Sequence, residues 1–284
     1  MKIIRIVLPP SHDFVLFGCT HEGSHMSHEV GIDNLIHQIH RGKNTYCGHM
    51  GDAIEAISID DKRFDLTAKI SIPLQQAQKF IKRYKPIAHK MKFELLGNHE
   101  MKLWKFGNLS QYMAHELGVE YGTYSCIVEV YDKKVYEKKN LLYRMYVSHG
   151  FGVLSSNAKD PEQRKANKMA SLKQRLKGKA GDCLIMAMGH THQLIVCPPS
   201  DELIIEHSTG KPKQKYVSQG NATDDFIEPN RRWYVNTGSY YKLYTDDIEI
   251  SGYGEVKGYD PTELGHARII CRDRKIMTIK KVIA

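Results

Sequence analysis

The chain has no long run of apolar residues. A membrane-spanning helix needs about 18 or more such residues in succession, and no segment of the 284 residues meets that requirement. The first residues, MKIIRIVLPPSHD, contain only a short apolar stretch and no small-residue cleavage site, so no signal peptide is predicted. We therefore expect no membrane partner, and we expect a cytoplasmic location.

The sequence also lacks closely spaced cysteine pairs and any sign of a domain boundary. A chain of this length can bury a substantial core without disulfides, so reduced thiols are expected. There is no repeat, no low-complexity tract and no linker rich in Pro, Gly or Ser, which predicts one domain over residues 1–284. The six cysteines are scattered, without a C-x-x-C pair: Cys19, Cys47, Cys126, Cys183, Cys197 and Cys271.

The composition is that of an ordinary globular protein with a basic balance. Hydrophobic residues make up 41% of the chain and charged residues 26%, with a formal net charge of +9. A positive charge favours a phosphate-bearing partner, nucleic acid included. Because the excess is spread over the whole chain, it identifies no particular partner, and nothing in the composition indicates an oligomeric state.

Strand-like and helical segments alternate along the chain. KIIRIVLP and DFVLFG predict two strands joined by a turn, and CIVEVY, NLLYRMYVS, CLIMAMG, RWYVNTGSY and a terminal hairpin follow later. Apolar spacing predicts helices over residues 26–42, 72–86 and 160–182. Helices that intervene early, followed by strands, predict an α/β (α+β) fold with a mixed sheet sandwich and outer helices. Residues 208 to 225 are expected to form a surface loop.

Five short polar motifs contain the residues suited to chemistry. They are CTH at 19–21, GD at 51–52, GNHE at 97–100, SHG at 148–150 and GHTH at 189–192, and at least three follow an apolar strand directly. Loops at one edge of a sheet can converge in space. Their metal-donor side chains are too many for one tetrahedral ion, whereas two ions sharing a carboxylate would use them all. The seven donors are Cys19, His21, Asp52, Asn98, His149, His190 and His192.

The order and spacing of these motifs resemble the calcineurin-like metallophosphoesterase superfamily, whose series is D-x-H, G-D, G-N-H-D/E, H and G-H-x-H. VNTGSY, near residue 238, is similar to a further element of that family. The resemblance implies a four-layer αββα sandwich in which helices flank two mixed sheets, with a dinuclear metal site at the strand ends. It also implies hydrolysis of a phosphomonoester or phosphodiester by a hydroxide activated between two divalent transition-metal ions, manganese, zinc or iron.

The resemblance implies a role for each matched residue. Asp52 would bridge the ions, and His99 would protonate the leaving oxygen as general acid. Glu55, three residues after the bridging aspartate, would orient His99 and stabilise its charged form. The first ion would be held by Cys19, His21, Asp52 and His192, and the second by Asp52, Asn98, His149 and His190.

Cys19 departs from the family, which most often has aspartate at this position. A thiolate beside a divalent cation keeps the ligand charge of −1, and its softness favours zinc or iron over magnesium. Alternatively, Cys19 is an inert core cysteine and the first site is empty or weak. We favour the ligand interpretation because every other ligand of the family pattern is present.

The substrate class stays open at this stage. GDAIEA lacks the arginine that follows the acidic residue in serine/threonine protein phosphatases, so the resemblance to that branch is poor. A nuclease or phosphodiesterase acting on nucleic acid suits the basic charge, and a small-molecule monoesterase suits the motifs equally well. A non-catalytic protein-binding scaffold is disfavoured because His99 is present. The basic helix over residues 162–179 is interpreted as a solvated outer face in preference to a phosphate-contact surface.

Overall fold

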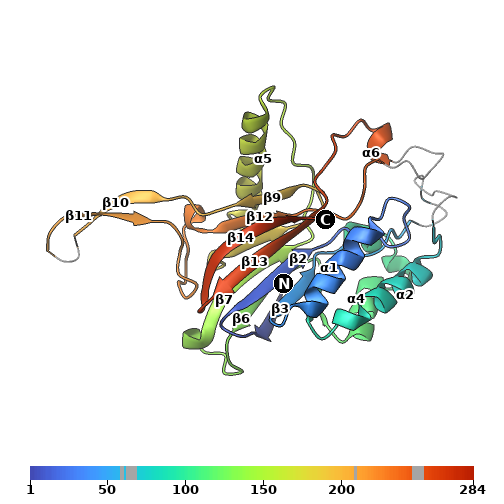
Figure 1. The fold of residues 1–284 in the computed structure, drawn as a ribbon, viewed down its shortest axis with the longest axis horizontal. Helices are drawn as coiled ribbons and strands as arrows, with labels where there is room; N and C mark the ends of the chain where they lie inside the picture. The colour runs from blue at the N-terminus through green and yellow to red at the C-terminus, as the bar shows by residue number, and fades with distance from the viewer. Residues whose placement is uncertain (58–60, 62–68, 208–209, 245–252) are drawn as a thin grey trace.

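The computed structural model describes residues 1–57, 61, 69–207, 210–244 and 253–284. Two mixed six-stranded sheets form the centre of the molecule, and helices lie outside them (Figure 1). The chain is thus of mixed α/β class, with the two mixed sheets that were expected. No helix in the described ranges is both long enough and apolar enough to cross a bilayer.

The sheet that we name sheet A contains both parallel and antiparallel pairs. β1 and β6 are parallel, as are β7, β8 and β12, whereas the β6–β7 and β12–β9 pairs are antiparallel. Every residue of β8 and of β12 is buried, as is typical of central parallel strands covered on both faces. In spatial order the strands are β1 (Lys2–Val7), β6 (Ser125–Tyr131), β7 (Leu141–Ser148), β8 (Ile185–Met188), β12 (Trp233–Thr237) and β9 (Leu194–Cys197).

The second sheet, sheet B, is antiparallel on one side and parallel on the other. β14, β13 and β2 are antiparallel neighbours, and β2, β3, β4 and β5 run parallel. The first two predicted strands, β1 and β2, therefore do not pair with one another but belong to different sheets. The order is β14 (Lys275–Ile283), β13 (Gly265–Arg272), β2 (His12–Phe17), β3 (Thr45–His49), β4 (Met91–Glu94) and β5 (Glu120–Tyr121).

Three apolar clusters hold these elements together. The largest joins the two sheets and includes Leu16 of β2 and Val128 of β6. A second lies between sheet B and its helices α1 (Glu29–Arg41), α2 (Pro73–Tyr84) and α4 (Leu109–Leu117). In a third, Leu172 and Leu176 of α5 (Pro161–Leu176) contribute to a cluster with residues of β8, β9 and β12. All six cysteines are buried and free.

The helix boundaries follow from local sequence. α5 begins after Asp160, whose carboxylate accepts a hydrogen bond from Gln163 N at 2.7 Å, and Pro161 occupies its first position. α4 ends at Gly118, which adopts a left-handed φ of 66°. Two helices are single turns, α3 (Asn98–Met101) and α6 (Tyr253–Val256), and 3-10 turns occupy Lys85–Ile87, Trp104–Phe106, Lys138–Asn140 and Pro229–Arg231.

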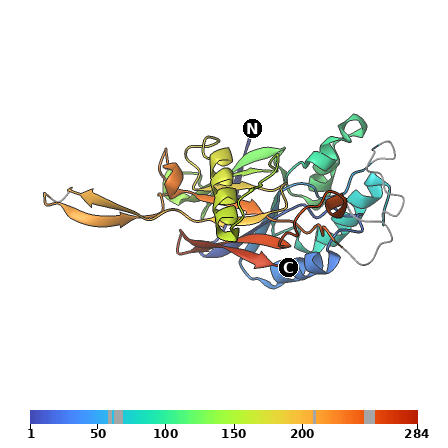
Figure 2. The ribbon, with the colours of Figure 1, turned by 90° about the horizontal axis from the view of Figure 1, so that it is seen from above.

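One projecting element departs from the sequence expectation. Residues 208 to 225 were expected to form a loop, but Lys213–Val217 is strand β11, which pairs antiparallel with β10 (Glu202–Glu206). Residues 208 and 209 lie outside the described residues. The two strands form a ribbon that extends away from the sheets in both ribbon views (Figures 1 and 2). The sequence of β11, KQKYV, is polar and lacks the apolar alternation that predicts a strand. The segment is a strand because it pairs with β10.

Candidate metal centre

The five polar motifs lie at the carboxyl ends of neighbouring strands. β2 leads to Cys19, β3 to Asp52 and β4 to Asn98, and these three strands are parallel in sheet B. In sheet A the parallel strands β7 and β8 lead to His149 and His190. Because parallel strands end at the same edge of a sheet, the topology brings all five motifs together.

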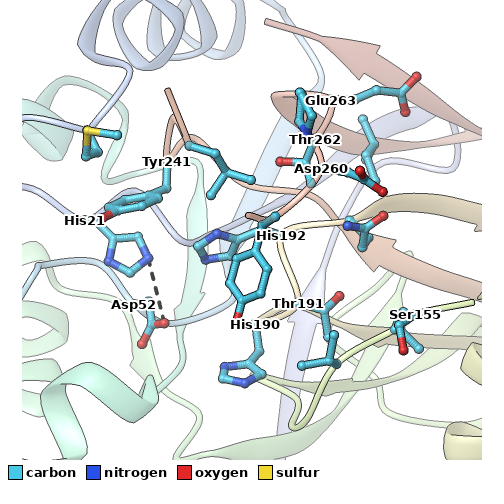
Figure 3. A pocket seen from close by; sticks show the side chains of 18 of the residues that line it. His21, Asp52, Ser155, His190, Thr191, His192, Tyr241, Asp260, Thr262 and Glu263 are labelled. Carbon is cyan, nitrogen blue, oxygen red and sulfur yellow. Dashed lines mark ion pairs between the residues drawn. The ribbon is translucent and has the colours of Figure 1, made fainter. Parts of the chain in front are cut away.

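The donor atoms of these residues approach one another closely. Among the residues that the structure describes, three groups of potential His, Cys and Asp ligands each have their donor atoms within 4.8 Å of one another. Cys19 joins His21 and His192 in one group and Asp52 and His149 in another, while the third consists of His21, Asp52 and His99. Figure 3 shows Asp52 and three of the histidines turned toward one space.

Asp52 lies at the centre of the cluster. One carboxylate oxygen, Oδ2, is 3.3 Å from His149 Nε2 and 3.8 Å from His21 Nε2. The other, Oδ1, accepts a hydrogen bond of 3.0 Å from the backbone N–H of His99. Burial by itself would raise the pKa of Asp52, but His149, His99 and His21 together hold that pKa well below its usual range. Asp52 therefore carries a negative charge between two sets of donors.

Asn98 connects the histidines on the sheet A side. Its Oδ1 is 2.8 Å from His149 Nε2 and 2.7 Å from His190 Nδ1. His149 Nδ1 is 2.8 Å from the carbonyl of Met50, which fixes the ring and leaves Nε2 facing Asp52 and Asn98. Burial opposes protonation of His149 and Asp52 favours it, so that its pKa is raised. Burial and the neighbouring His149 lower the pKa of His190 to about 4.

The backbone at these loops adopts unusual conformations. Nine non-glycine residues in the described part of the chain have positive φ, and five of them are candidate ligands. Left-handed φ costs an ordinary side chain about 1 kcal/mol or more and persists only where surrounding structure imposes it. The five are Cys19 at 50°, His21 at 48°, Asp52 at 52°, His190 at 67° and His192 at 56°.

The loops that bear Cys19, Asp52 and Gly97 pack closely against one another through their backbones. Cys19 N–H donates to the carbonyl of Gly51 at 2.9 Å. A Cβ on Gly97 would lie 2.1 Å from Asp52 N and 2.2 Å from Asp52 Oδ1. The Glu100 carboxylate accepts hydrogen bonds of 3.0 Å from both Gly97 N–H and Ile54 N–H, bridging two loops. Glycine at 97 is therefore required by the close approach of the loop bearing Asp52.

Glu55 makes a different contact from the one that the resemblance implies. Its carboxylate was expected to orient His99, but Oε1 is 4.0 Å from His99 Nδ1 while Oε2 is 3.0 Å from His21 Nδ1. The backbone carbonyl of Glu55 instead lies 2.6 Å from His99 Nδ1. Burial lowers the pKa of His21, but Glu55 and Asp52 outweigh this and raise it. Burial lowers the pKa of His99.

The donor set fits a bound metal ion. His21 Nε2 is buried and has no hydrogen-bond partner, although the ring is held in place through Nδ1. A buried nitrogen without a partner costs about 1–3 kcal/mol, and coordination to an ion would satisfy it. The Cys19 thiol points into the same group, and burial together with Asp52 raises its pKa well above the usual value. An ion would have to displace this proton to bind sulfur.

A cavity of about 1460 Å³ opens onto the cluster. Sequence reasoning missed Tyr241, which lines this cavity and whose ring lies 4.7 Å from His21 and 5.5 Å from His192. Its position directly after VNTGSY was the feature of the sequence that could have identified it. His25 also lines the cavity, whereas His49 is fully buried, with its Nδ1 3.0 Å from Glu94 Oε1.

Comparison with models of known protein families finds no match, and comparison with curated proteins finds no similar protein. The functional argument therefore depends on the geometry of the cluster and on the motif resemblance.

Proposed function

We propose that the protein is a metal-dependent phosphoesterase of the calcineurin-like type. The observation that carries the proposal is the convergence of the predicted donors at one edge of two sheets. Five of them, Cys19, His21, Asp52, His149 and His192, fall in groups whose donor atoms lie within 4.8 Å of one another. The other two, Asn98 and His190, join the cluster through the contacts of Asn98 Oδ1 with His149 and His190. Two divalent ions held about 3.5–4 Å apart clamp a phosphoryl group and activate a water. The two sheets with α1, α2 and α4 beside one and α5 beside the other support the four-layer αββα arrangement.

Each residue of the cluster has a role under this proposal. One ion would be held by Cys19, His21 and His192, the other by Asn98, His149 and His190, with Asp52 shared between them. Sulfur as a donor favours zinc or iron, with manganese also compatible with the remaining ligands. The left-handed loops hold the donors in place before any ion arrives, so that little ordering entropy is lost on binding.

His99 is the proposed general acid. Its Nδ1 faces the Glu55 carbonyl at 2.6 Å, which requires a proton on Nδ1, so Nε2 carries the transferable proton only when the ring is the imidazolium. Its backbone N–H donates to Asp52, which ties the ring to the metal-binding loop. The Glu55 carboxylate fixes the His21 tautomer, and in this way acts on a ligand more directly than on the acid.

The same observations give less support to a non-catalytic scaffold, and they leave nucleic acid as one possible substrate. A non-catalytic scaffold would not need the buried charges of Asp52 and its histidines, which are costly unless a bound ion or substrate uses them. Action on nucleic acid is a variant of the main proposal, favoured by the net charge of +9 and by the basic residues Arg164, Lys165 and Lys168 that line the cavity.

The proposal is tested by metal analysis and hydrolysis assays on the purified protein. We expect two equivalents of a transition metal and cleavage of a monoester, a diester or single-stranded DNA with manganese or zinc. His99→Ala should retain both ions and lose about 10²–10⁴-fold in kcat. The loss should be larger for an alkyl ester than for a p-nitrophenyl ester, because p-nitrophenolate leaves without a proton. His115→Ala, at an exposed histidine on α4, is the matched control. Metal-free protein, or hydrolysis that is indifferent to His99, would contradict the proposal.

A further inference from the structure

Three cationic side chains of α5 line the cavity, Arg164, Lys165 and Lys168. Arg164 and Lys168 are four residues apart, which puts them on the same side of the helix, and both line the cavity. They are half-buried, in contrast to the exposed Lys165 between them. From the sequence this helix was expected to present a solvated outer face. In the structure, part of its basic face lines the cavity that opens onto the candidate metal centre.

Lys168 is held close to the ligand loop. Its Nζ donates a hydrogen bond of 3.1 Å to Gln193 Oε1, and Gln193 directly follows the candidate ligand His192. Within the described ranges, neither Lys168 nor Arg164 has a carboxylate within ion-pair distance. Two half-buried cations without counter-charges are costly on their own and are suited to a bound anion.

α5 is fixed relative to the candidate ligands by a second set of contacts. Arg175 donates from both terminal nitrogens, to the carbonyls of Phe151 and Val153 at 2.5 Å each. This segment follows His149 directly, so the loop that bears a ligand and the helix that bears the cations are held together. Leu172 and Leu176, one and two turns beyond Lys168, anchor the C-terminal half of α5 in the third apolar cluster. The positions of the cations are therefore set by the same framework as the metal centre.

The cavity lining is acidic in one part and basic in another. Asp260 and Glu263 lie at another part of its rim, shown in Figure 3 apart from His21 and Asp52. Carboxylates repel a phosphate, whereas Arg164 and Lys168 attract one. The volume of about 1460 Å³ exceeds the roughly 300–1,000 Å³ of an ordinary small-ligand pocket. A substrate with a single phosphate would leave the cationic wall and much of this space unused.

We propose that Arg164 and Lys168 form a subsite for a second phosphate of the substrate, next to the phosphate that is hydrolysed. The inference builds on the proposed phosphoesterase function and narrows its substrate class to esters that carry at least two phosphate groups. Gln193 positions Lys168, and the loop from His149 to Val153 positions the helix. A nucleic acid strand and a small bisphosphorylated metabolite share this chemistry, and the experiment separates them.

Binding tests the subsite independently of catalysis. The metal-loaded His99→Ala protein, in which turnover is slow, is titrated by calorimetry with thymidine 3′,5′-bisphosphate and with thymidine 5′-monophosphate. We expect the bisphosphate to bind about tenfold more tightly per cation engaged, and the further changes Arg164→Gln and Lys168→Gln to abolish the difference. Lys173→Gln in the same background, on the same helix but outside the cavity, should leave the difference intact. Equal affinity of the His99→Ala protein for both ligands, or an unchanged preference when Arg164 and Lys168 are also replaced, would overturn the inference.

Turnover then identifies the source of the second phosphate. We compare the dinucleotide pTpT, a sugar bisphosphate and p-nitrophenyl phosphate in the metal-loaded wild type and in Lys168→Gln. Lys168→Gln should raise KM for the substrate with two phosphates about tenfold more than KM for p-nitrophenyl phosphate, whereas Lys173→Gln, outside the cavity, should leave the hydrolysis of all three esters unchanged. Preference for pTpT indicates a nucleic acid strand, and preference for the sugar bisphosphate indicates a metabolite. Absence of turnover with every ester refutes the phosphoesterase function while the calorimetry still decides the subsite.

Discussion

The strand-end loops of the candidate metal centre and the β10–β11 ribbon are stabilised in opposite ways. In the loops, Cys19, His21 and Asp52 are at most 2% exposed, and their left-handed backbone is imposed by contacts between segments far apart in the chain. In the ribbon the two strands pair only with each other, and Ile205 and Tyr216 are each 71% exposed. The loops therefore depend on the whole fold, whereas the ribbon depends on local pairing. Changes of similar size should have very different effects in the two regions.

The largest effect is expected at Gly97. An alanine Cβ would overlap Asp52 and the Glu100 carboxylate, and neither can move without disturbing the loops. We expect Gly97→Ala to lower the free energy of unfolding by about 3 kcal/mol and to prevent metal binding. Gly178→Ala is the control, because a Cβ there has open space around it, and its effect should stay within about 0.5 kcal/mol. Urea unfolding and metal analysis measure both, and a Gly97→Ala protein that kept its metal would disprove the packing argument.

The next effect concerns the sulfur donor. Cys19→Ala should bind one transition-metal ion where the wild type binds two, because the ion assigned to Cys19, His21 and His192 loses its thiolate ligand. Cys19→Asp should retain both ions and shift preference from zinc toward manganese. Cys47→Ala, another fully buried cysteine outside the cluster, controls for the loss of core volume. Two ions in the Cys19→Ala protein would show that Cys19 is an inert core residue.

A smaller loss of folding stability is expected at low pH. It should arise from His266, which contacts Tyr240 behind the loop that bears Cys19. His266 Nδ1 lies 2.8 Å from the hydroxyl of Tyr240, whose N–H donates to the Cys19 carbonyl at 3.1 Å. Burial, with help from Arg268, lowers the pKa of His266 to about 3, whereas an unfolded histidine titrates near about 6.5. Between these values only the unfolded chain binds the proton, so stability falls as pH drops, by at most about 1.4 kcal/mol per pH unit.

Urea unfolding of the metal-free protein between pH 4 and pH 7 measures this slope. His266→Phe should reduce it, while Tyr240→Phe, which keeps the imidazole, should preserve it. An unchanged slope in His266→Phe would assign the acid sensitivity to other groups.

The smallest effect is expected in the ribbon. Replacing Ile205 and Tyr216 with lysine should change the free energy of unfolding by less than about 0.5 kcal/mol each, because both side chains are already exposed. Metal content and hydrolysis should be unchanged. A large loss of stability in either variant would show that the ribbon packs against another surface, and analytical ultracentrifugation of the same samples would reveal a second copy.

The sequence predicted the elements better than their pairing. Apolar periodicity placed α2 and α5 within a few residues of their bounds, and the strands ahead of Asp52 and His190 were recognised by their apolar runs. Local pattern could not assign β1 and β2 to different sheets, because strand pairing depends on partners more than a hundred residues away. β11 was not predicted because its exposed lysines break the apolar pattern of a strand. It is stabilised by pairing with β10.

For the candidate site, the sequence indicated which side chains come together but not their surroundings. The motifs named the seven donors because ligand types and order are local information. The choice of Glu55 between His21 and His99 depends on loop geometry, and the nearer partner, His21, was not foreseen. The place of Lys168 beside Gln193 depends on how α5 packs on sheet A, which no single segment encodes.

The position of β2 in sheet B has a consequence for the order of events during synthesis. β2 lies between β3 and β13, so the strand that precedes Cys19 lacks one neighbour until residues 265–272 have been made. At about 5–20 residues per second, the ribosome exposes this edge for more than ten seconds. Folding through such distant contacts is slow, and the unpaired β2 edge is open to association with other chains in that interval. We therefore expect the β2 edge to need protection from other chains during translation.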